Sequence, residues 1–304
     1  MHTMAEMSSR AHAVSDCGGG GGSVQDAGMS PVAYLGPVGT FSHLVARKRF
    51  GSDDRLVACP TMGAIFDCLL ADRSALAVVP IENSSGGTIY DTVDLLIENA
   101  GSLYVIEEIA LDVRIALIGR DGAPVRRVFS HFVQLQHHRD WLRAHYPDAK
   151  VEAVASTAIA AERAAATKGG AALSAPGAAA IYGLDVLAEP DVDGKVNITH
   201  FLVLSHRERR PAKPAEARTA LAVSFSNECG SLYRFLEPFA RAKVNINRII
   251  SRPFPGNPDR AVFFLEVDGA PGVPAFDQVI DRARKRSETF EEFGSYPWKR
   301  RLRS

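Results

Sequence analysis

The stretch that decides the fold is 195–204, KVNITHFLVL. Its second half, 201–204, is a continuous apolar run of the kind that forms a buried strand. Its first half places three hydrogen-bonding side chains just before that run. Alternation along an extended chain points Asn197 and Thr199 to one face and His200 to the other. Such a polar entrance is either a capped strand end at the surface or the border of a functional site.

The segments before this stretch predict the fold class. Strand-like runs alternate with helix-like runs over 32–110, and the alternation restarts at 125. This pattern indicates an α/β fold with parallel strand pairing. The chain passes between the two series near 108–112 and again near 188–192, so the quoted stretch returns it to the first. We therefore expect a two-lobed region over 31–205 with a cleft between the lobes: lobe 1 from about 31–110 and 190–205, and lobe 2 from about 111–189.

The last third of the chain predicts a separate small domain. Residues 206–217, HRERRPAKPAEA, are charged, contain proline and lack an apolar face, which is typical of a linker. Over 218–304 the expected elements follow the order βαββαβ, a ferredoxin-like arrangement. We expect the basic ending 299–303, KRRLR, to be a solvated tail. The glycine-rich segment 1–30 is expected to be a disordered extension.

Charge and cysteine content narrow the class of protein. Lys+Arg 35 balance Asp+Glu 35, which argues against nucleic acid or an anionic membrane as a partner. The four cysteines form no C-x-x-C pair, so their spacing predicts neither a zinc site nor a disulfide framework. No run approaches the roughly 18 consecutive apolar residues of a membrane span. The first residues also lack the apolar core of a secretory signal, so we expect a cytoplasmic protein with reduced thiols.

Two glycine-rich turns follow strands of lobe 1. The first is 36–42, GPVGTFS, and the second is 82–88, ENSSGGT. Free N–H groups and a helix dipole at such turns suit a carboxylate or a phosphate. Neither turn has the P-loop lysine pattern or the dinucleotide pattern G-x-G-x-x-G, and a helix cap would explain either one alone. Their position at the carboxyl ends of strands favours a ligand site.

Hydroxyl side chains recur at strand ends in both lobes. Each one alone is typical of a helix cap. Together they predict a cleft that is rich in hydroxyls and poor in fixed charge, which suits a small polyoxygenated anion. The sequence has no His/Asp/Glu cluster with metal-ligand spacing and no G-x-S-x-G elbow of a serine hydrolase. The residues concerned are Thr40, Ser84, Ser85, Ser130, His131, Ser156, Thr157 and Thr199.

Three stretches of the two-lobed region resemble the prephenate dehydratase family. They are 34–42 (YLGPVGTFS), 79–87 (VPIENSSGG) and 197–203 (NITHFLV). In the last third, 229–232 (CGSL) and 250–253 (ISRP) resemble the ACT regulatory domain of the same enzymes. The resemblance covers about 32–298 in the family's order and spacing.

The resemblance implies an activity and an architecture. The family converts prephenate to phenylpyruvate, water and carbon dioxide in L-phenylalanine biosynthesis, as a carbon–oxygen lyase without a metal or organic cofactor. The implied fold is a periplasmic-binding-protein-like pair of lobes followed by a ferredoxin-like ACT domain. L-phenylalanine is the implied effector, and a homodimer or homotetramer is the implied assembly.

The resemblance also assigns roles to residues. Thr199 is implied to stabilise the departing hydroxide, with Glu82 and Asn83 as further catalytic residues. Substrate contacts are implied for Thr40, Ser42, Ser84, Ser85, Gly86, Ser130, His131, His137, Thr157, Asn197, His200 and Phe201. Effector contacts are implied for Asn227, Gly230, Ser231, Leu232, Ser251, Arg252 and Pro253.

Several positions depart from the family's pattern. The family usually has arginine where His200 stands and glutamine where His137 stands. Arginine offers a fixed charge and a bidentate fork, which histidine does not supply near neutral pH. In the ACT motifs, Ile250 replaces the usual glutamate and Cys229 the usual proline, which weakens the case for feedback by phenylalanine.

Two alternatives stay open at this point. One keeps the substrate and changes the outcome, as a prephenate decarboxylase that does not aromatise; His137 and His200 motivate it, and the retained loop 82–85 argues against it. The other is a ligand-binding sensor without catalysis. Alternation points His200 away from the face of Thr199, so His200 is also a candidate for setting the position of the strand.

Overall fold

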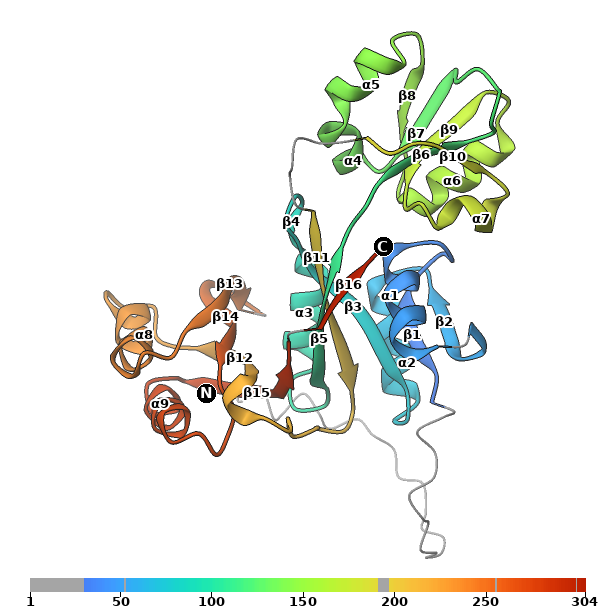
Figure 1. Cartoon of the computed structure of the whole chain (residues 1–304). Coiled ribbons are helices and arrows are strands. Elements are labelled where there is room, and N and C mark those ends of the chain that lie inside the picture. Colours follow the sequence, from blue (N-terminus) through green and yellow to red (C-terminus); the bar gives the residue numbers. More distant parts are fainter. Residues whose placement is uncertain (1–29, 52, 191–196, 255, 299) are drawn as a thin grey trace, which may run out of the picture.

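The computed structural model describes residues 30–51, 53–190, 197–254, 256–298 and 300–304. Three β-sheets organise these residues into two lobes and a C-terminal domain (Figure 1). The expected extension 1–30 lies outside the described residues except for its last position. Within the described part of the chain, none of the helices has the length and apolar character needed to cross a bilayer.

Lobe 1 is built on a mixed sheet with the order β16-β5-β11-β3-β1-β2, and β4 pairs with β3. As expected, β1 is parallel to β2 and β3. By contrast, β11 is antiparallel to both of its neighbours, because it carries the chain back from lobe 2. The strands are β1 (Val32–Leu35), β2 (Leu56–Cys59), β3 (Leu76–Asn83), β4 (Gly87–Thr88), β5 (Tyr104–Asp112), β11 (Ile198–Ser205) and β16 (Arg300–Arg303); the helices are α1 (Phe41–Phe50), the 3₁₀ turn η2 (Asp53–Arg55), α2 (Met62–Ala71) and α3 (Tyr90–Glu98).

Lobe 2 has a second sheet with the order β10-β6-β9-β7-β8. Strands β7, β8 and β9 are parallel, whereas β6 is antiparallel to β9 and β10. Two short helices, α4 and α5, follow β7, because the backbone leaves the helical region at His138. The elements are β6 (Ala116–Gly119), β7 (Arg127–Ser130), α4 (Phe132–His137), α5 (Arg139–His145), β8 (Lys150–Ala153), α6 (Thr157–Ala166), β9 (Gly170–Ser174), α7 (Ala178–Tyr182) and β10 (Asp185–Ala188).

The C-terminal domain follows the predicted order βαββαβ. Its antiparallel sheet has the order β13-β14-β12-β15. Leu221 and Val223 of this sheet pack against Phe235 and Phe276 of the two helices, so the helices cover one face. The elements are β12 (Ala217–Ser224), α8 (Ser231–Ala242), β13 (Ile246–Phe254), β14 (Asn257–Asp268), α9 (Pro274–Arg284) and β15 (Thr289–Pro297); the 3₁₀ turn η3 (Pro214–Glu216) precedes them.

The other face of this sheet packs on lobe 1. Ala220, Ala222 and Phe264 share a hydrophobic core with Val93 and Leu96 of α3. The two units thus bury apolar surface against each other, while the C-terminal unit keeps its own sheet and a core of its own. The sequence carried a signal: β12 is apolar on both faces and is buried along its whole length.

The basic end of the chain is not the solvated tail that the charge pattern indicated. Arg300–Arg303 forms β16, which pairs in parallel with β5 at the edge of lobe 1 (Figure 1). Nε of Arg300 lies 2.5 Å from the Glu107 carboxylate, and Nη2 of Arg301 lies 2.6 Å from that of Asp112. The positive charges are thus matched by acidic residues of the neighbouring strand, and the C-terminal domain ends before β16.

Candidate active site

A cavity of about 400 Å³ lies between the lobes. Both lobes contribute its walls, so the cleft expected from the two α/β series is present. Nine of the predicted site residues line it: Thr40, Ser42, Asn83, Gly86, His131, Ser156, Thr157, Thr199 and Phe201. The other lining residues are Leu35, Gly36, Phe41, Pro80, Gly87, Ile89, Phe132, Val133, Gln134 and Ala155.

Helices of both lobes begin at this cavity: α1 in lobe 1, and α4 and α6 in lobe 2. Thr40 caps α1 by accepting a hydrogen bond from the His43 N–H at 3.2 Å, and Ser156 caps α6 by accepting one from the Ile159 N–H at 3.1 Å. Such caps contribute about 1 kcal/mol of stability each. The remaining N–H groups of the first turns and the positive ends of the helix dipoles favour an anionic ligand between them.

The first glycine-rich turn is also a contact between the lobes. The Tyr182 hydroxyl of α7 donates a hydrogen bond to the Val38 carbonyl at 2.8 Å. Gly39 has a φ of +92°, and a Cβ there would lie 3.1 Å from the Tyr182 ring. Glycine is therefore required both by the left-handed backbone and by the close approach of lobe 2.

Asn83 and Thr199 form a hydrogen-bonded pair across β3 and β11. Nδ2 of Asn83 donates to Oγ1 of Thr199 at 2.8 Å and to Oδ1 of Asn197 at 2.9 Å. Oδ1 of Asn83 accepts the backbone N–H groups of Ser85 and Gly86, which fixes the orientation of the amide. Because Thr199 accepts from Asn83, its own hydroxyl hydrogen can be donated into the cavity.

Four further predicted residues lie outside the lining of the cavity. The Ser84 hydroxyl accepts a hydrogen bond from the Ile198 N–H at 2.9 Å, which ties the second glycine-rich turn to β11. Ser130 is fully buried and donates to the Leu173 carbonyl at 2.6 Å. Asn197 contacts Asn83 as described above. Ser84, Ser85, Ser130 and Asn197 therefore hold the walls of the cavity in place and do not line it.

The cavity lining also leaves out Glu82, which was expected to be catalytic, and His200 and His137, which were expected to contact the substrate. Consecutive strand residues face opposite sides, so Glu82 and His200 point away from the cavity that Asn83 and Thr199 line. Glu82 instead contacts Arg248, and His200 contacts Glu108. His137 is exposed at the end of α4, one turn beyond the residues that reach the cavity.

The cavity is polar without fixed charge. Among the described residues that line it, none is Asp, Glu, Lys or Arg, and His131 is the titratable group. Burial lowers the pKa of His131 below its usual value, so the imidazole is neutral near pH 7. In the part of the chain that the structure describes, no group of three or more His, Cys, Asp or Glu is placed to hold a metal ion.

Sequence reasoning missed part of lobe 2's wall. Phe132, Val133 and Gln134 occupy the first turn of α4 and line the cavity. Their signal was positional, since they follow His131 at the carboxyl end of β7. Phe41, in the first turn of α1, follows the same rule. The first helical turn after a strand end is therefore as informative as the turn itself.

The residues expected to bind an effector lie in two elements of the C-terminal domain. Gly230 and Ser231 begin α8, with Gly230 in the left-handed region and Leu232 partly exposed; Asn227 lies in the loop before them. Ser251, Arg252 and Pro253 belong to β13. Arg252 contacts Asp94 of α3 at 2.6 Å, so its guanidinium is paired with lobe 1.

Fold and cavity together define a two-lobed α/β protein with an anion-suited cleft and an appended βαββαβ domain. The chain belongs to the prephenate dehydratase family: the family model with that description matches residues 32–209. It is 33% identical over 274 residues to the prephenate dehydratase of Amycolatopsis methanolica, with 88% of each chain covered.

Two solved structures are similar over most of their length. The prephenate dehydratase of Arthrobacter aurescens, determined in complex with L-Phe, has a TM-score of 0.79 at 28% identity and covers 88% of this chain and 89% of its own. A structure described as GqqA, a novel type of quorum quenching acylase, has a TM-score of 0.79 at 27% identity and covers 88% and 97%.

Proposed function

We propose that the chain is a prephenate dehydratase, a lyase of aromatic amino acid biosynthesis. The observation that carries the proposal is the Asn83–Thr199 pair in a cavity bordered by the capped N-termini of α1 and α6. In the proposed reaction the ring carboxylate leaves as carbon dioxide, and the electrons of that C–C bond enter the ring. The C4–O bond breaks at the same time, and the departing hydroxide takes up one proton to leave as water.

The residues divide this work between binding and charge stabilisation. The N-termini of α1 and α6 are proposed to bind the two carboxylates of prephenate, because their first-turn N–H groups border the cavity. Thr199, oriented by Asn83, donates its hydroxyl hydrogen to the C4 oxygen as negative charge develops there. An alcohol is a weak acid, so hydrogen bonding is the main contribution and solvent supplies the proton.

A single assay separates this activity from its competitors. Purified protein is incubated with prephenate, and phenylpyruvate is measured by its absorbance in alkali, with mass analysis of the products. Phenylpyruvate formation supports the proposal. A decarboxylated, non-aromatic keto acid would identify the alternative decarboxylase, and binding without turnover would identify a sensor.

An acylase is the second candidate, because one similar structure carries that description. A hydrolytic serine or threonine needs a general base next to its hydroxyl. The neighbour of Thr199 is the amide nitrogen of Asn83, which donates a hydrogen bond and does not accept a proton. We therefore expect no release of amine from an N-acyl substrate in a parallel assay.

The C-terminal domain is proposed to be an ACT domain that binds L-phenylalanine. Its βαββαβ order and the L-Phe complex of the similar Arthrobacter enzyme support this assignment. The proposed effector residues are Asn227, Gly230, Ser231, Leu232, Ser251, Arg252 and Pro253. A rise in melting temperature with L-phenylalanine and none with D-phenylalanine would support it; no shift with either would contradict it.

Assembly and location complete the proposal. We expect a cytoplasmic homodimer or homotetramer, because the resemblance to ACT domains implies pairing through the C-terminal domain. Sedimentation equilibrium of the full chain tests the assembly, and a monomer at micromolar concentration would overturn it.

A further inference from the structure

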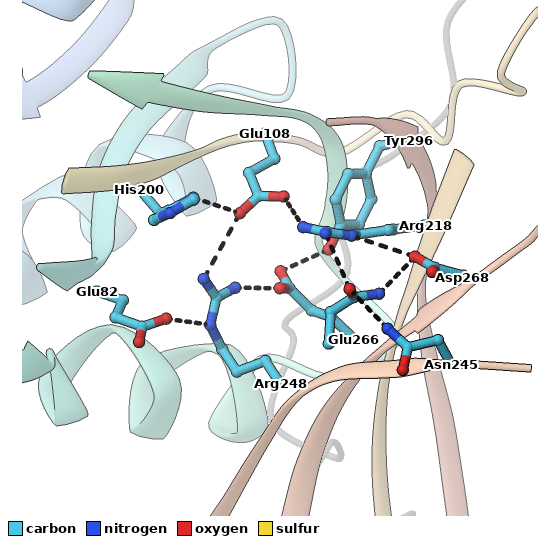
Figure 2. A network of polar contacts seen from close by, with 10 residues as sticks. Glu82, Glu108, His200, Arg218, Asn245, Arg248, Glu266, Asp268 and Tyr296 are labelled. Carbon is cyan, nitrogen blue, oxygen red and sulfur yellow. Dashed lines mark hydrogen bonds and ion pairs between the residues drawn. The ribbon is translucent and has the colours of Figure 1, made fainter. Parts of the chain in front are cut away.

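A cluster of charged side chains lies behind the cavity, between lobe 1 and the C-terminal domain (Figure 2). At its centre is Arg248 of β13, whose side chain is only 9% exposed. Its guanidinium contacts three carboxylates from three different strands. Nε donates to Oε2 of Glu82 at 2.8 Å, Nη1 contacts Glu266, and Nη2 lies 3.5 Å from Oε1 of Glu108.

This arginine reaches β3 directly, through Glu82, and β11 indirectly, through Glu108 of β5. Glu82 directly precedes Asn83 on β3. Glu108 accepts a contact from Nδ1 of His200 at 2.9 Å, and His200 directly follows Thr199 on β11. In the strand register, Glu82 lies opposite His200 and Asn83 lies opposite Thr199. We call these two neighbouring residue pairs the rung: Asn83–Thr199 faces the cavity, and Glu82–His200 faces the C-terminal domain. Arg248 of the C-terminal domain thus holds the Glu82–His200 side of the rung.

We propose that Arg248 is a positioning residue of the active site, which acts on Asn83 and Thr199 through Glu82 and the Glu108–His200 contact. The expected effects on turnover rest on the proposed dehydratase function. The expected effect on the positions of Asn83 and Thr199 does not depend on it. This positioning role gives the C-terminal domain a part in basal turnover, because the domain supplies this group whether or not an effector is bound.

Loss of Arg248 should affect Glu82 more than Glu108, because the two carboxylates differ in their other partners. Burial alone would lower the pKa of Arg248, but Glu266, Glu108 and Glu82 raise it above its usual value, so the residue stays charged. Glu108 retains Arg218 as a second partner at 2.7 Å. Glu82 is partly exposed, and the arginine that it contacts is Arg248. Loss of Arg248 therefore releases the β3 end of the rung first.

The test is a double-mutant cycle on Arg248 and Glu82. We expect Arg248→Met and Glu82→Gln each to lower kcat by about tenfold and to leave KM within about twofold, because they misplace the reacting pair without removing substrate contacts. The double variant should be no worse than Arg248→Met alone, since both changes remove one link. Additive losses would show that Glu82 acts on the substrate directly, and an unchanged kcat in Glu82→Gln would overturn the proposal.

The matched control is a variant that removes a different contact between lobe 1 and the C-terminal domain. Asp94→Asn removes the contact between α3 and Arg252, which also joins lobe 1 to the C-terminal domain. This variant should keep kcat within about twofold, because the link does not reach the rung. An equal loss in Asp94→Asn would mean that domain docking in general, and not Arg248, sets the rate. Arg248→Lys, which keeps the charge, should recover part of the loss.

A second readout does not depend on turnover. Amide hydrogen exchange is measured at Ser84 and Ile198, whose N–H groups bond to the Ile198 carbonyl and the Ser84 hydroxyl beside the rung. Exchange should rise about tenfold or more in Glu82→Gln and stay unchanged in Asp94→Asn. If the wild type does not convert prephenate, this difference still supports the positioning role while the proposed function fails. Equal exchange in all three proteins would contradict the positioning role.

Discussion

The two faces of one strand pair, β3 and β11, have opposite chemical character. The face toward the cavity presents Asn83 and Thr199, which are neutral and joined by a hydrogen bond of 2.8 Å. The face toward the C-terminal domain presents Glu82 and His200, which join a buried cluster of carboxylates and arginines (Figure 2). Residues adjacent in sequence therefore serve different purposes, because strand alternation sends them to opposite sides.

The difference has a physical basis. A neutral cleft that donates hydrogen bonds can stabilise charge as it develops without binding a dianion so tightly that product is retained. Buried charges, by contrast, have to be matched, because removing one partner leaves an uncompensated charge and is strongly destabilising. Burial raises the pKa of Glu108, but His200, Arg248 and Arg218 outweigh it, so the pKa lies below its usual value. The cluster thus keeps Glu108 ionised and paired at neutral pH.

The largest effect is expected on the cavity face, at Thr199. Thr199→Ala should lower kcat for phenylpyruvate formation by about 100-fold or more, which is typical for the loss of one donor to developing charge. Thr199→Ser, which keeps the hydroxyl, should retain activity within about tenfold. Steady-state rates of both variants check this, and an active alanine variant would refute the role of the hydroxyl.

Asn83 should show the next largest effect. Asn83→Asp keeps the oxygen that accepts the Ser85 and Gly86 N–H groups but loses the donor to Thr199. We expect a fall in kcat of roughly 10- to 100-fold with little change in melting temperature, because the turn is preserved. Measuring both quantities separates orientation from folding; a large loss of stability with normal kcat would contradict the assignment.

His131, which lines the cavity, predicts a pH dependence of catalysis. The pKa of His131 in the cavity is lowered by burial, so it protonates only as pH falls below about 6.5, its ordinary value. The imidazolium then attracts the dianionic substrate, and kcat/KM should rise roughly three- to tenfold toward pH 5.5. His131→Asn should abolish this rise and His200→Asn should keep it. The profile of kcat/KM, corrected for spontaneous decay of prephenate, decides between them.

The smallest effect is expected from His200→Arg. An arginine there adds a charge next to Glu108, on the face away from the substrate. Because the cluster is already paired, kcat should stay within about threefold and stability should change by about 1 kcal/mol or less. Thermal unfolding and turnover of the purified variant check this. A collapse of activity would show that His200 has a role of its own in the reaction.

Much of this arrangement was readable from local patterns in the sequence. The two α/β series predicted the lobes and the cleft. The strand-end pattern predicted five residues of its wall, Thr40, His131, Ser156, Thr157 and Thr199, and the family resemblance added Ser42, Asn83, Gly86 and Phe201. Alternation in 197–200 already separated the face of Thr199 from that of His200. These features depend on the spacing of a few neighbouring residues.

What the sequence did not reveal depends on contacts between distant segments. β16 was interpreted as a tail because nothing local shows that Glu107 and Asp112 lie beside its arginines. Glu82 was assigned to catalysis from a motif, although its partner, Arg248, is more than 160 residues away. The docking of the C-terminal sheet on lobe 1 had one local trace, the two apolar faces of β12.

The most direct test of the account is a crystal structure of Thr199→Ala with prephenate bound. We predict prephenate in the cavity between the lobes, with its carboxylates at the N-termini of α1 and α6. Its C4 oxygen should lie where the Thr199 hydroxyl stands in the wild type, and Glu82 should still pair with Arg248. A substrate whose C4 oxygen contacts Glu82 or His200 would contradict the division between a catalytic face and a positioning face.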